Sequence, residues 1–403
     1  MAINEPVVSV DQFLGIRNRQ PSERLPAGAL SEAENVDIDD SQQPRLRKGY
    51  SLVKALTNVS SAYATHDQDR MFVVSDGMLY SIAEDLTTTL LKSGLSGGEL
   101  FWSELGDRVV YAGSDYGVIH YGNVATDLII PTPAAPAVEV ISGNLSPGRY
   151  QVTCLFVQDR EPHLEGGAPE SMVVELTDAN KGLRITLPTL AGHIVALYAS
   201  DINDPTLCLV GQFVGGAVVN LTENEAITSF PLAIEQQQTY PIPETCDRIA
   251  FFGASLYAAS YSPGENQTAI FFSKPFWSNL FDLHKDYILI PGRVYAMAGT
   301  PSGLLIATGN EIFELSVDGS FFQLADYGVT PGRPCAFDHA TGQMFLATLR
   351  GVCSYPPFTN HTQDNVSLDF GDNSATGVID QGGFRRFVTI INGSSTPHNS
   401  QDS

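Results

Sequence analysis

Gly94-Leu-Ser-Gly-Gly98 comes closest to a catalytic motif, because it formally matches the G-x-S-x-G signature of serine hydrolases. In those enzymes the serine sits on a sharp turn between a strand and a helix. No helical periodicity follows Gly98, and no alternation of strands and helices surrounds the motif. The stretch therefore predicts an ordinary turn and no nucleophile.

Metal ligands do not gather in the sequence either. The eight histidines never pair at i, i+4, and the five cysteines contain no CxxC pair. Asp37-Ile-Asp-Asp40 and Ser75-Asp-Gly77 offer carboxylates, but the twelve-position spacing of a calcium loop is absent. Asp-Gly is also the dipeptide that a tight hairpin turn demands. We therefore predict no catalytic, cofactor-binding or metal-binding residues, no cofactor, and buried reduced cysteines.

Paired carboxylates would be needed for glycoside hydrolysis, which some propeller enzymes perform. The chain has 45 Asp and Glu, so no pair stands out, and the aspartate boxes of sialidases are not reproduced at Ser75 or Ser114. We predict that the protein is not an enzyme. A polysaccharide-cleaving activity remains the alternative in this class.

The net charge of the chain indicates which partners it is not expected to bind. Against the 45 acidic residues stand 22 Lys and Arg, for a net charge of −23, so tight sequence-specific binding of DNA or RNA is not expected. The first residues lack the basic and apolar regions of a secretion signal, and no run of eighteen apolar residues occurs. We expect synthesis in the cytoplasm and no membrane insertion.

Five similar phrases recur along the chain, each an apolar strand, a small or polar turn, and a second apolar strand. They begin at Arg70, Arg108, Arg248, Gly303 and Gln343. Equivalent positions after the turn are 39, 138, 56 and 40 residues apart, so two of the four spacings indicate a unit near 40. That length is typical of a propeller blade of four short strands.

One hairpin cannot bury its apolar face alone, whereas several stacked four-stranded sheets can. We therefore predict an all-β fold: a five- to six-blade β-propeller in which each phrase is the inner hairpin of a blade. The 138-residue spacing exceeds one repeat unit by about the length of a small domain. A two-layer β-sandwich for the whole chain is the alternative, since it also contains such hairpins.

The excess falls after the proline-rich stretch 131–136, which marks a boundary. The sequence that follows alternates between strands and turns. It predicts seven strands, at 137–141, 148–158, 170–176, 182–187, 193–200, 208–214 and 218–221. This pattern suits an immunoglobulin-like β-sandwich. Leu145-Ser-Pro-Gly-Arg-Tyr-Gln-Val152 resembles fibronectin type III modules. The predicted order is an N-terminal arm with first strands (1–50), a first propeller segment (51–131), the inserted fibronectin-like sandwich (137–240), a second propeller segment (244–391) and a flexible tail (392–403).

The arm carries a second resemblance. Leu25-Pro-Ala-Gly-Ala-Leu-Ser-Glu-Ala-Glu-Asn-Val-Asp-Ile-Asp39, leading to Arg45-Leu-Arg-Lys-Gly-Tyr50, is similar to the opening of tailed-bacteriophage virion proteins of the tail nozzle and tail-tip type. In that group this phrase precedes propeller repeats. The usual glycine before the basic strand is replaced here by Gln42-Gln43-Pro44.

The resemblance implies a structural protein of the virion tail, assembled in the host cytoplasm: a nozzle or distal tail-tube subunit in a ring around the DNA exit channel. Its partners would be further copies of itself, the head–tail adaptor or neighbouring tail proteins, and DNA passing through without specific binding. The predicted subunit contacts are Leu25, Pro26, Asn35, Asp37, Arg45 and Arg47, unless the arm merely covers the propeller. The alternative function is a peripheral tail-fibre, baseplate or decorating module that binds host surface carbohydrate.

Overall fold

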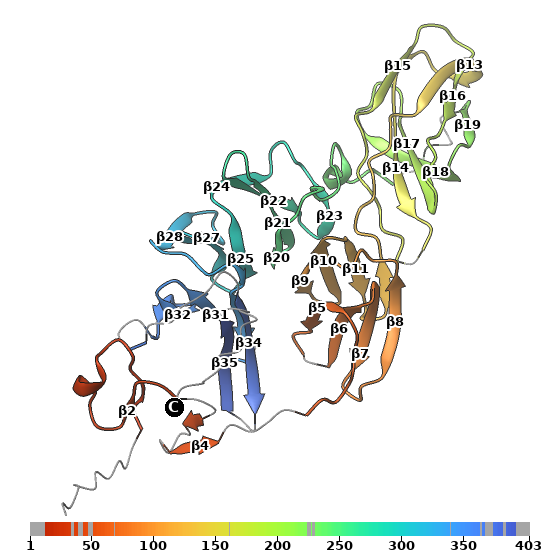
Figure 1. Ribbon diagram of the computed structural model, residues 1–403. Helices are drawn as coiled ribbons and strands as arrows, with labels where there is room; N and C mark the ends of the chain where they lie inside the picture. Colours follow the sequence, from red (N-terminus) through yellow and green to blue (C-terminus); the bar gives the residue numbers. More distant parts are fainter. Residues whose placement is uncertain are drawn as a thin grey trace, which may run out of the picture. The chain divides into compact units, whose positions relative to one another are not determined.

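The computed structural model describes the chain with short gaps. The described residues are 13–33, 36–38, 43–46, 51–67, 69–160, 162–223, 227, 230–338, 340–362, 365–366, 374–381 and 384–391. They form strands almost throughout, and their helical elements are two single 3-10 turns, η1 (Ser22–Arg24) and η3 (Ile234–Gln236) (Figure 1). The predicted all-β fold class of propeller-blade sheets with an inserted sandwich is confirmed.

The chain divides into two compact units. One is Thr57–Arg293, and the other combines Met1–Leu56 with Val294–Ser403. Each unit contains four-stranded antiparallel sheets whose strands follow one another in chain order, which is the topology of a propeller blade.

Three blade-type sheets belong to the unit Thr57–Arg293. The first contains β5 (Val59–Ala64), β6 (Arg70–Ser75), β7 (Met78–Ala83) and β8 (Thr88–Ser93); the second contains β9 (Leu100–Leu105), β10 (Arg108–Gly113), β11 (Gly117–His120) and β12 (Val124–Thr126). The third contains β20 (Arg248–Phe252), β21 (Ser255–Ser262), β22 (Gln267–Lys274), β23 (Trp277–Phe281) and β24 (Tyr287–Pro291).

The other unit contains two such sheets, a smaller three-stranded sheet and two short strand pairs near its N-terminal end. The blade-type sheets are β25 (Val294–Gly299), β26 (Gly303–Thr308), β27 (Ile312–Ser316) and β28 (Phe321–Ala325), then β30 (Cys335–Asp338), β31 (Gln343–Thr348), β32 (Gly351–Tyr355) and β33 (Thr359–Asn360). The smaller sheet joins β29 (Gly332–Arg333), β34 (Ser374–Gln381) and β35 (Phe384–Ile391).

Four of the five repeated phrases form the two inner strands of their sheets, as predicted. The phrase at Arg248 instead forms β20 and β21, which are the first two strands of the third sheet, with β22 following. The prediction was wrong by one strand at this phrase. The 56-residue spacing to the next phrase was long because it joined positions that are not equivalent.

The turn between β6 and β7 explains how such a hairpin closes. Asp76 and Gly77 both have positive φ, 51° and 71°, and Ser75 pairs with Met78 across the turn. Two consecutive positive φ values are those of a two-residue hairpin turn, and Asp and Gly tolerate them best. The interpretation of Ser75–Gly77 as a turn is therefore confirmed.

Strand β10 shows why the sheets stack. Val109 and Tyr111 are buried in the core shared with the first sheet, whereas Val110 and Ala112 are buried in the core shared with the third. Because successive side chains of a strand point to opposite faces, a strand that is apolar at every position must be covered on both. At about 1.5–3 kcal/mol for each large buried side chain, these two cores hold the three sheets together.

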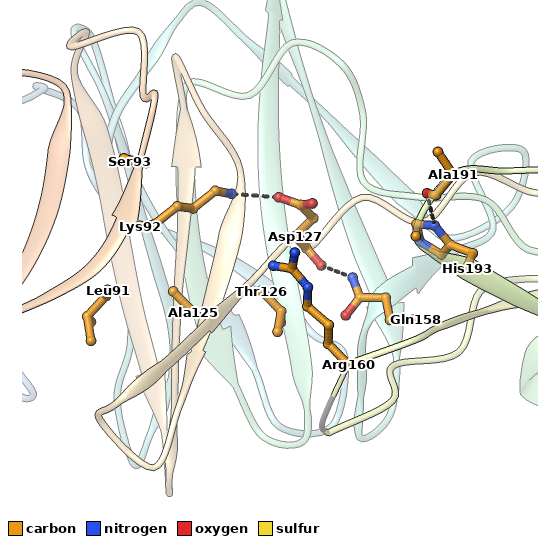
Figure 2. A pocket seen from close by; sticks show the side chains of 11 residues that line it. Leu91, Lys92, Ser93, Ala125, Thr126, Asp127, Gln158, Arg160, Ala191 and His193 are labelled. Atoms are coloured by element: carbon orange, nitrogen blue, oxygen red, sulfur yellow. Dashed lines mark hydrogen bonds and ion pairs between the residues drawn. The ribbon is translucent and has the colours of Figure 1, made fainter.

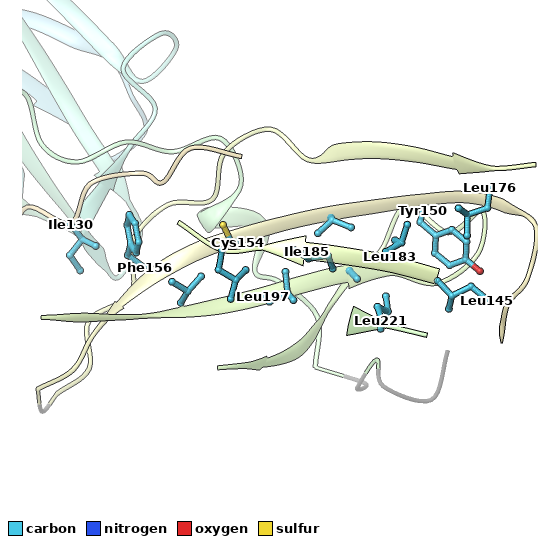
Figure 3. Packing of buried hydrophobic residues seen from close by; sticks show 14 residues of the cluster. Ile130, Leu145, Tyr150, Cys154, Phe156, Leu176, Leu183, Ile185, Leu197 and Leu221 are labelled. Atoms are coloured by element: carbon cyan, nitrogen blue, oxygen red, sulfur yellow. The ribbon is translucent and has the colours of Figure 1, made fainter. Parts of the chain in front are cut away.

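The inserted module lies between β12 and β20. Its strands are β13 (Ala137–Leu145), β14 (Gly148–Gln158), β15 (Met172–Leu176), β16 (Lys181–Thr186), β17 (His193–Ser200), β18 (Leu207–Val214) and β19 (Val218–Leu221). They form a three-stranded sheet, β13-β16-β19, and a four-stranded sheet, β15-β14-β17-β18. Figure 3 shows the apolar core between them, which extends from Tyr150 and Leu176 at one end to Phe156 and Ile130 at the other.

Tyr150 anchors one end of this core. Its ring is fully buried, and its hydroxyl donates a hydrogen bond of 2.9 Å to the backbone carbonyl of Ser146. A buried tyrosine that bonds back to the backbone a few residues upstream is a recurring device of immunoglobulin-like sandwiches.

Replacing Tyr150 by phenylalanine is expected to lower the free energy of unfolding by about 1 kcal/mol, because the ring still fills its place but the bond to Ser146 is lost. Denaturant unfolding followed by fluorescence measures the change. Tyr287→Phe is the control, since Tyr287 is 42% exposed. An equal loss of stability in both variants would contradict the role of the Tyr150 hydroxyl.

The N-terminal arm and the joint of the inserted sandwich as candidate functional sites

The described part of the arm contains little regular structure. The strand β1 (Gly15–Ile16) pairs in parallel with β2 (Ala29–Leu30), and the turn η1 lies between them. Leu25 is half-buried and Pro26 is exposed, while the carbonyl of Pro26 accepts a bond from the Ala29 amide. Proline at this point favours the extended backbone that brings β2 beside β1.

A hairpin follows, in which β3 (Val36–Ile38) pairs with β4 (Pro44–Leu46). Its register places two predicted contact residues, Asp37 and Arg45, directly opposite each other. The other two predicted contacts on this segment, Asn35 and Arg47, lie outside the described residues, as does the tail 392–403. The prediction that these residues contact a neighbouring subunit remains a prediction.

Apolar side chains on the arm are exposed to an unusual degree. We call this set the arm surface; it consists of Leu14, Ile16 and Leu46 of the arm, with Leu52 and Val53 directly after it. Leu46 is 85% exposed, Leu52 83% and Val53 72%. None of these three residues is among the contacts predicted from the sequence, which include the charged neighbours of Leu46; an apolar residue within a basic strand was the available signal. Several exposed apolar side chains within one segment of the chain make that segment a candidate contact surface.

Polar contacts at Glu165 join the inserted sandwich to Asn279 of the third sheet and to Gln236 of η3. The Asn279 amide donates to the carbonyl of Glu165 at 2.8 Å, and the Gln236 amide donates to the Glu165 carboxylate at 2.6 Å. Gln236 and Asn279 are 2% and 3% exposed. Such bonds fix geometry because breaking one leaves a buried polar group unpaired. We call this region the joint.

A second portion of the joint surrounds Thr239, whose side chain is fully buried. Its carbonyl accepts a bond of 2.9 Å from the Thr132 hydroxyl. The next residue, Tyr240, exchanges two backbone hydrogen bonds with Phe281 of β23, at 2.9 and 2.8 Å. The sandwich is thus held on both of its connections, at Thr132 and at Thr239, within the unit Thr57–Arg293.

His120 is a buried titratable group in the second sheet. It is 3% exposed and lies opposite Arg108 in the register of β10 and β11. Burial, with a smaller contribution from the Arg108 charge, lowers the pKa of His120 to about 4. The folded protein therefore keeps this imidazole neutral at pH values where the unfolded chain, with a pKa near 6.5, binds a proton.

Stability should consequently fall as pH decreases from 6.5 towards 4, because the unfolded state takes up the proton and the folded state does not. The loss attributable to His120 is at most about 1.4 kcal/mol per pH unit in this window. We expect His120→Gln to flatten the pH dependence of the free energy of unfolding there. An unchanged slope in the variant would show that His120 is not responsible.

A small acidic hollow of about 240 Å³ lies beside these strands, between the first two sheets. Its lining includes Asp67, Asp69, Glu104 and Asp107 around Arg70. The Tyr63 hydroxyl donates to the Glu104 carboxylate at 3.2 Å, and burial together with that carboxylate raises the pKa of Tyr63. Nowhere among the residues described do three or more His, Cys, Asp or Glu side chains gather as metal ligands would.

The remaining candidates from the sequence lie apart from each other. Ser96 is on the loop between β8 and β9, and its hydroxyl donates to the Asp115 carboxylate at 2.6 Å. Of the acidic run after Asn35, Asp37 lies in β3 and the last two residues are outside the described ranges. All five cysteines are free, and Cys154, Cys246 and Cys353 are buried. In the portion of the chain that is described, no helix is long and apolar enough to cross a membrane.

Comparison with known proteins does not identify a family for this chain. No family model and no curated protein matches the chain. Among solved structures, a streptogramin B lyase is 10% identical with a TM-score of 0.32, covering 85% of this chain and 96% of its own. Virginiamycin B lyase from Staphylococcus aureus is 10% identical with a TM-score of 0.33, covering 82% and 91%. Dipeptidyl peptidase 4 of Porphyromonas gingivalis is 11% identical with a TM-score of 0.31, covering 84% and 50%. Similarity at this level carries no argument about what the chain does.

Proposed function

We propose that the protein is a structural subunit of a tailed-phage virion, in the nozzle or distal tube of the tail, where copies form a ring around the DNA exit channel. The role is mechanical and electrostatic and requires no chemical step or cofactor. Subunits assemble in the host cytoplasm, and the ring joins the head–tail adaptor or neighbouring tail proteins. In the sequence, the predicted contacts Leu25, Pro26, Asp37 and Arg45 lie between Ile16 and Leu46 of the arm surface.

The observation that carries this proposal is the arm surface. Leu46, Leu52 and Val53 leave large apolar areas in water, and such areas are costly unless a partner covers them. The same arm holds the phrase that resembles tail proteins. A neighbouring subunit is a fitting partner, because head-to-tail contacts between identical subunits form a ring when the rotation between them closes.

Two further features support the proposal. The joint makes the inserted sandwich and the third sheet a stiff body, as a wall under mechanical load requires. A net charge of −23 repels DNA phosphates, so that DNA slides past without adhering. Neither feature would suit a protein that holds DNA in place.

The purified full-length chain tests the proposal. We expect it to form rings of one fixed copy number with a central opening, seen by native mass measurement and electron microscopy, and to show no retention of duplex DNA at low salt. A chain that remains monomeric at every concentration, or that binds duplex DNA tightly, would count against the proposed role.

A further inference from the structure

A cleft of about 600 Å³ lies where the first two sheets meet the inserted sandwich, all within the unit Thr57–Arg293. Figure 2 shows its lining from four segments: β8, the end of β12, the end of β14 and the start of β17. The volume is in the range of small-molecule sites. The arm, the joint and the acidic hollow contribute no residue to it.

Three polar atoms at this cleft are buried and have no hydrogen-bond partner: Gln158 Oε1, Thr126 Oγ1 and His193 Nε2. Gln158 is 5% exposed and Thr126 is 7% exposed. Buried polar atoms in folded proteins are almost always paired, and an unpaired one costs about 1–3 kcal/mol. Three around one cleft indicate that the cleft is built for a ligand.

The chemistry of two of these atoms is fixed by their neighbours. The Gln158 amide nitrogen donates to the backbone carbonyl of Asp127 at 2.7 Å, so Oε1 is left as an acceptor. His193 Nδ1 lies 2.9 Å from the carbonyl of Ala191, which can only accept, so Nδ1 carries the proton. In the neutral ring Nε2 is then a second acceptor. Both atoms need a donor, which a carboxylate or phosphate oxygen cannot be.

The charge of the cleft differs from that of the protein. Lys92 and Arg160 line it against a single carboxylate, Asp127, in a chain with a net charge of −23. Lys92 is bound to Asp127 at 2.6 Å, and the side chain of Arg160, two residues beyond the end of β14, points towards Asp127 (Figure 2). A guanidinium is well suited to bind a carboxylate with two parallel hydrogen bonds.

We propose that this cleft binds an acidic saccharide unit, whose hydroxyls donate to Gln158 and His193 and whose carboxylate binds Arg160. Hydroxyls satisfy the two acceptors, and Thr126 can donate or accept. Leu91, Ala125 and Ala191 supply apolar wall for the ring of the sugar. The two acceptor atoms are buried in this structure, so binding requires side chains that line the cleft to move.

The test is titration of the full-length chain with glucuronic acid, N-acetylneuraminic acid and neutral galactose, followed by calorimetry and by amide chemical shifts of the cleft residues. We expect one acidic sugar to bind more tightly than galactose, with an affinity that falls as salt rises. Arg160→Gln should lower the affinity for the acidic sugar by about tenfold or more, so that the acidic sugar no longer binds more tightly than galactose. Arg149→Gln, an exposed arginine of the sandwich outside the cleft, is the control.

His193→Phe keeps the ring contact with Phe156 but removes the acceptor. It should therefore lower the affinity for the acidic sugars and for galactose alike. Absence of binding by all three probes, with water alone satisfying the buried acceptors, would overturn the proposal, as would binding that neither variant changes. The inference does not rest on the tail role. If the protein forms rings but binds no sugar, only the proposed sugar site is overturned. If it binds an acidic sugar but stays monomeric, only the proposed ring is overturned.

Discussion

Alanine at Gly167 is expected to destabilise the unit Thr57–Arg293 by at least about 3 kcal/mol. A Cβ at this position would overlap the carbonyl group of Thr239, and it would lie 2.7 Å from the Thr239 hydroxyl oxygen. Backbone atoms cannot rotate away as a flexible side chain can, so the two segments of the joint must separate. The bond from the Thr132 hydroxyl to the Thr239 carbonyl would be lost with them.

Thermal unfolding of Gly167→Ala and of Gly264→Ala provides the matched comparison. A Cβ at Gly264 meets nothing within 4 Å, so this control should be within about 0.5 kcal/mol of the parent protein. We further expect protease to cut Gly167→Ala between the sandwich and the third sheet before it cuts elsewhere. Equal stability of the two variants would show that the joint is not tightly packed.

The second large effect concerns assembly. Glutamate at Leu46 is expected to weaken ring formation by at least about a hundredfold, because it places a charge in an apolar contact. The fold of the isolated chain should be unaffected, since Leu46 is 85% exposed. Sedimentation over a range of concentrations measures the ring, and thermal unfolding checks the fold.

Val214→Glu is the control for assembly. Val214 is a comparably exposed apolar residue, at 75%, on β18 of the sandwich. Rings that form normally with glutamate at Leu46 would remove the arm surface from the contact. Rings that fail equally in both variants would point to the added charge rather than to the position.

All seven strands of the sandwich were predictable from the sequence; three have the predicted bounds, and the other four differ by one to four residues at an end. The strands at 148–158, 193–200 and 218–221 have the predicted bounds. Each is a β-branched or aromatic run ended by turn residues such as Pro, Gly or Asn, which are local signals. The five hairpins were predictable for the same reason. The phrase at Arg248 was misplaced because a hairpin signal does not say which strands of a sheet it forms.

The joint and the cleft were not predictable in this way. Asn279 bonds to a carbonyl 114 residues earlier in the chain, and the lining of the cleft comes from segments that no sequence period relates. Nothing local distinguishes Gln158 or His193 from polar residues at the end of any strand. The strand β34 was also missed, because its text, Ser-Ala-Thr-Gly-Val-Ile-Asp-Gln, is as polar as a loop.

The most direct test of the account is the position of this subunit in an assembled particle. A tagged copy of the full-length chain, incorporated during assembly and located by electron microscopy, should appear as a closed ring on the tail axis at the end farthest from the head. Labels at the periphery of the tail, or particles that contain no copy of the chain, would contradict the proposed role.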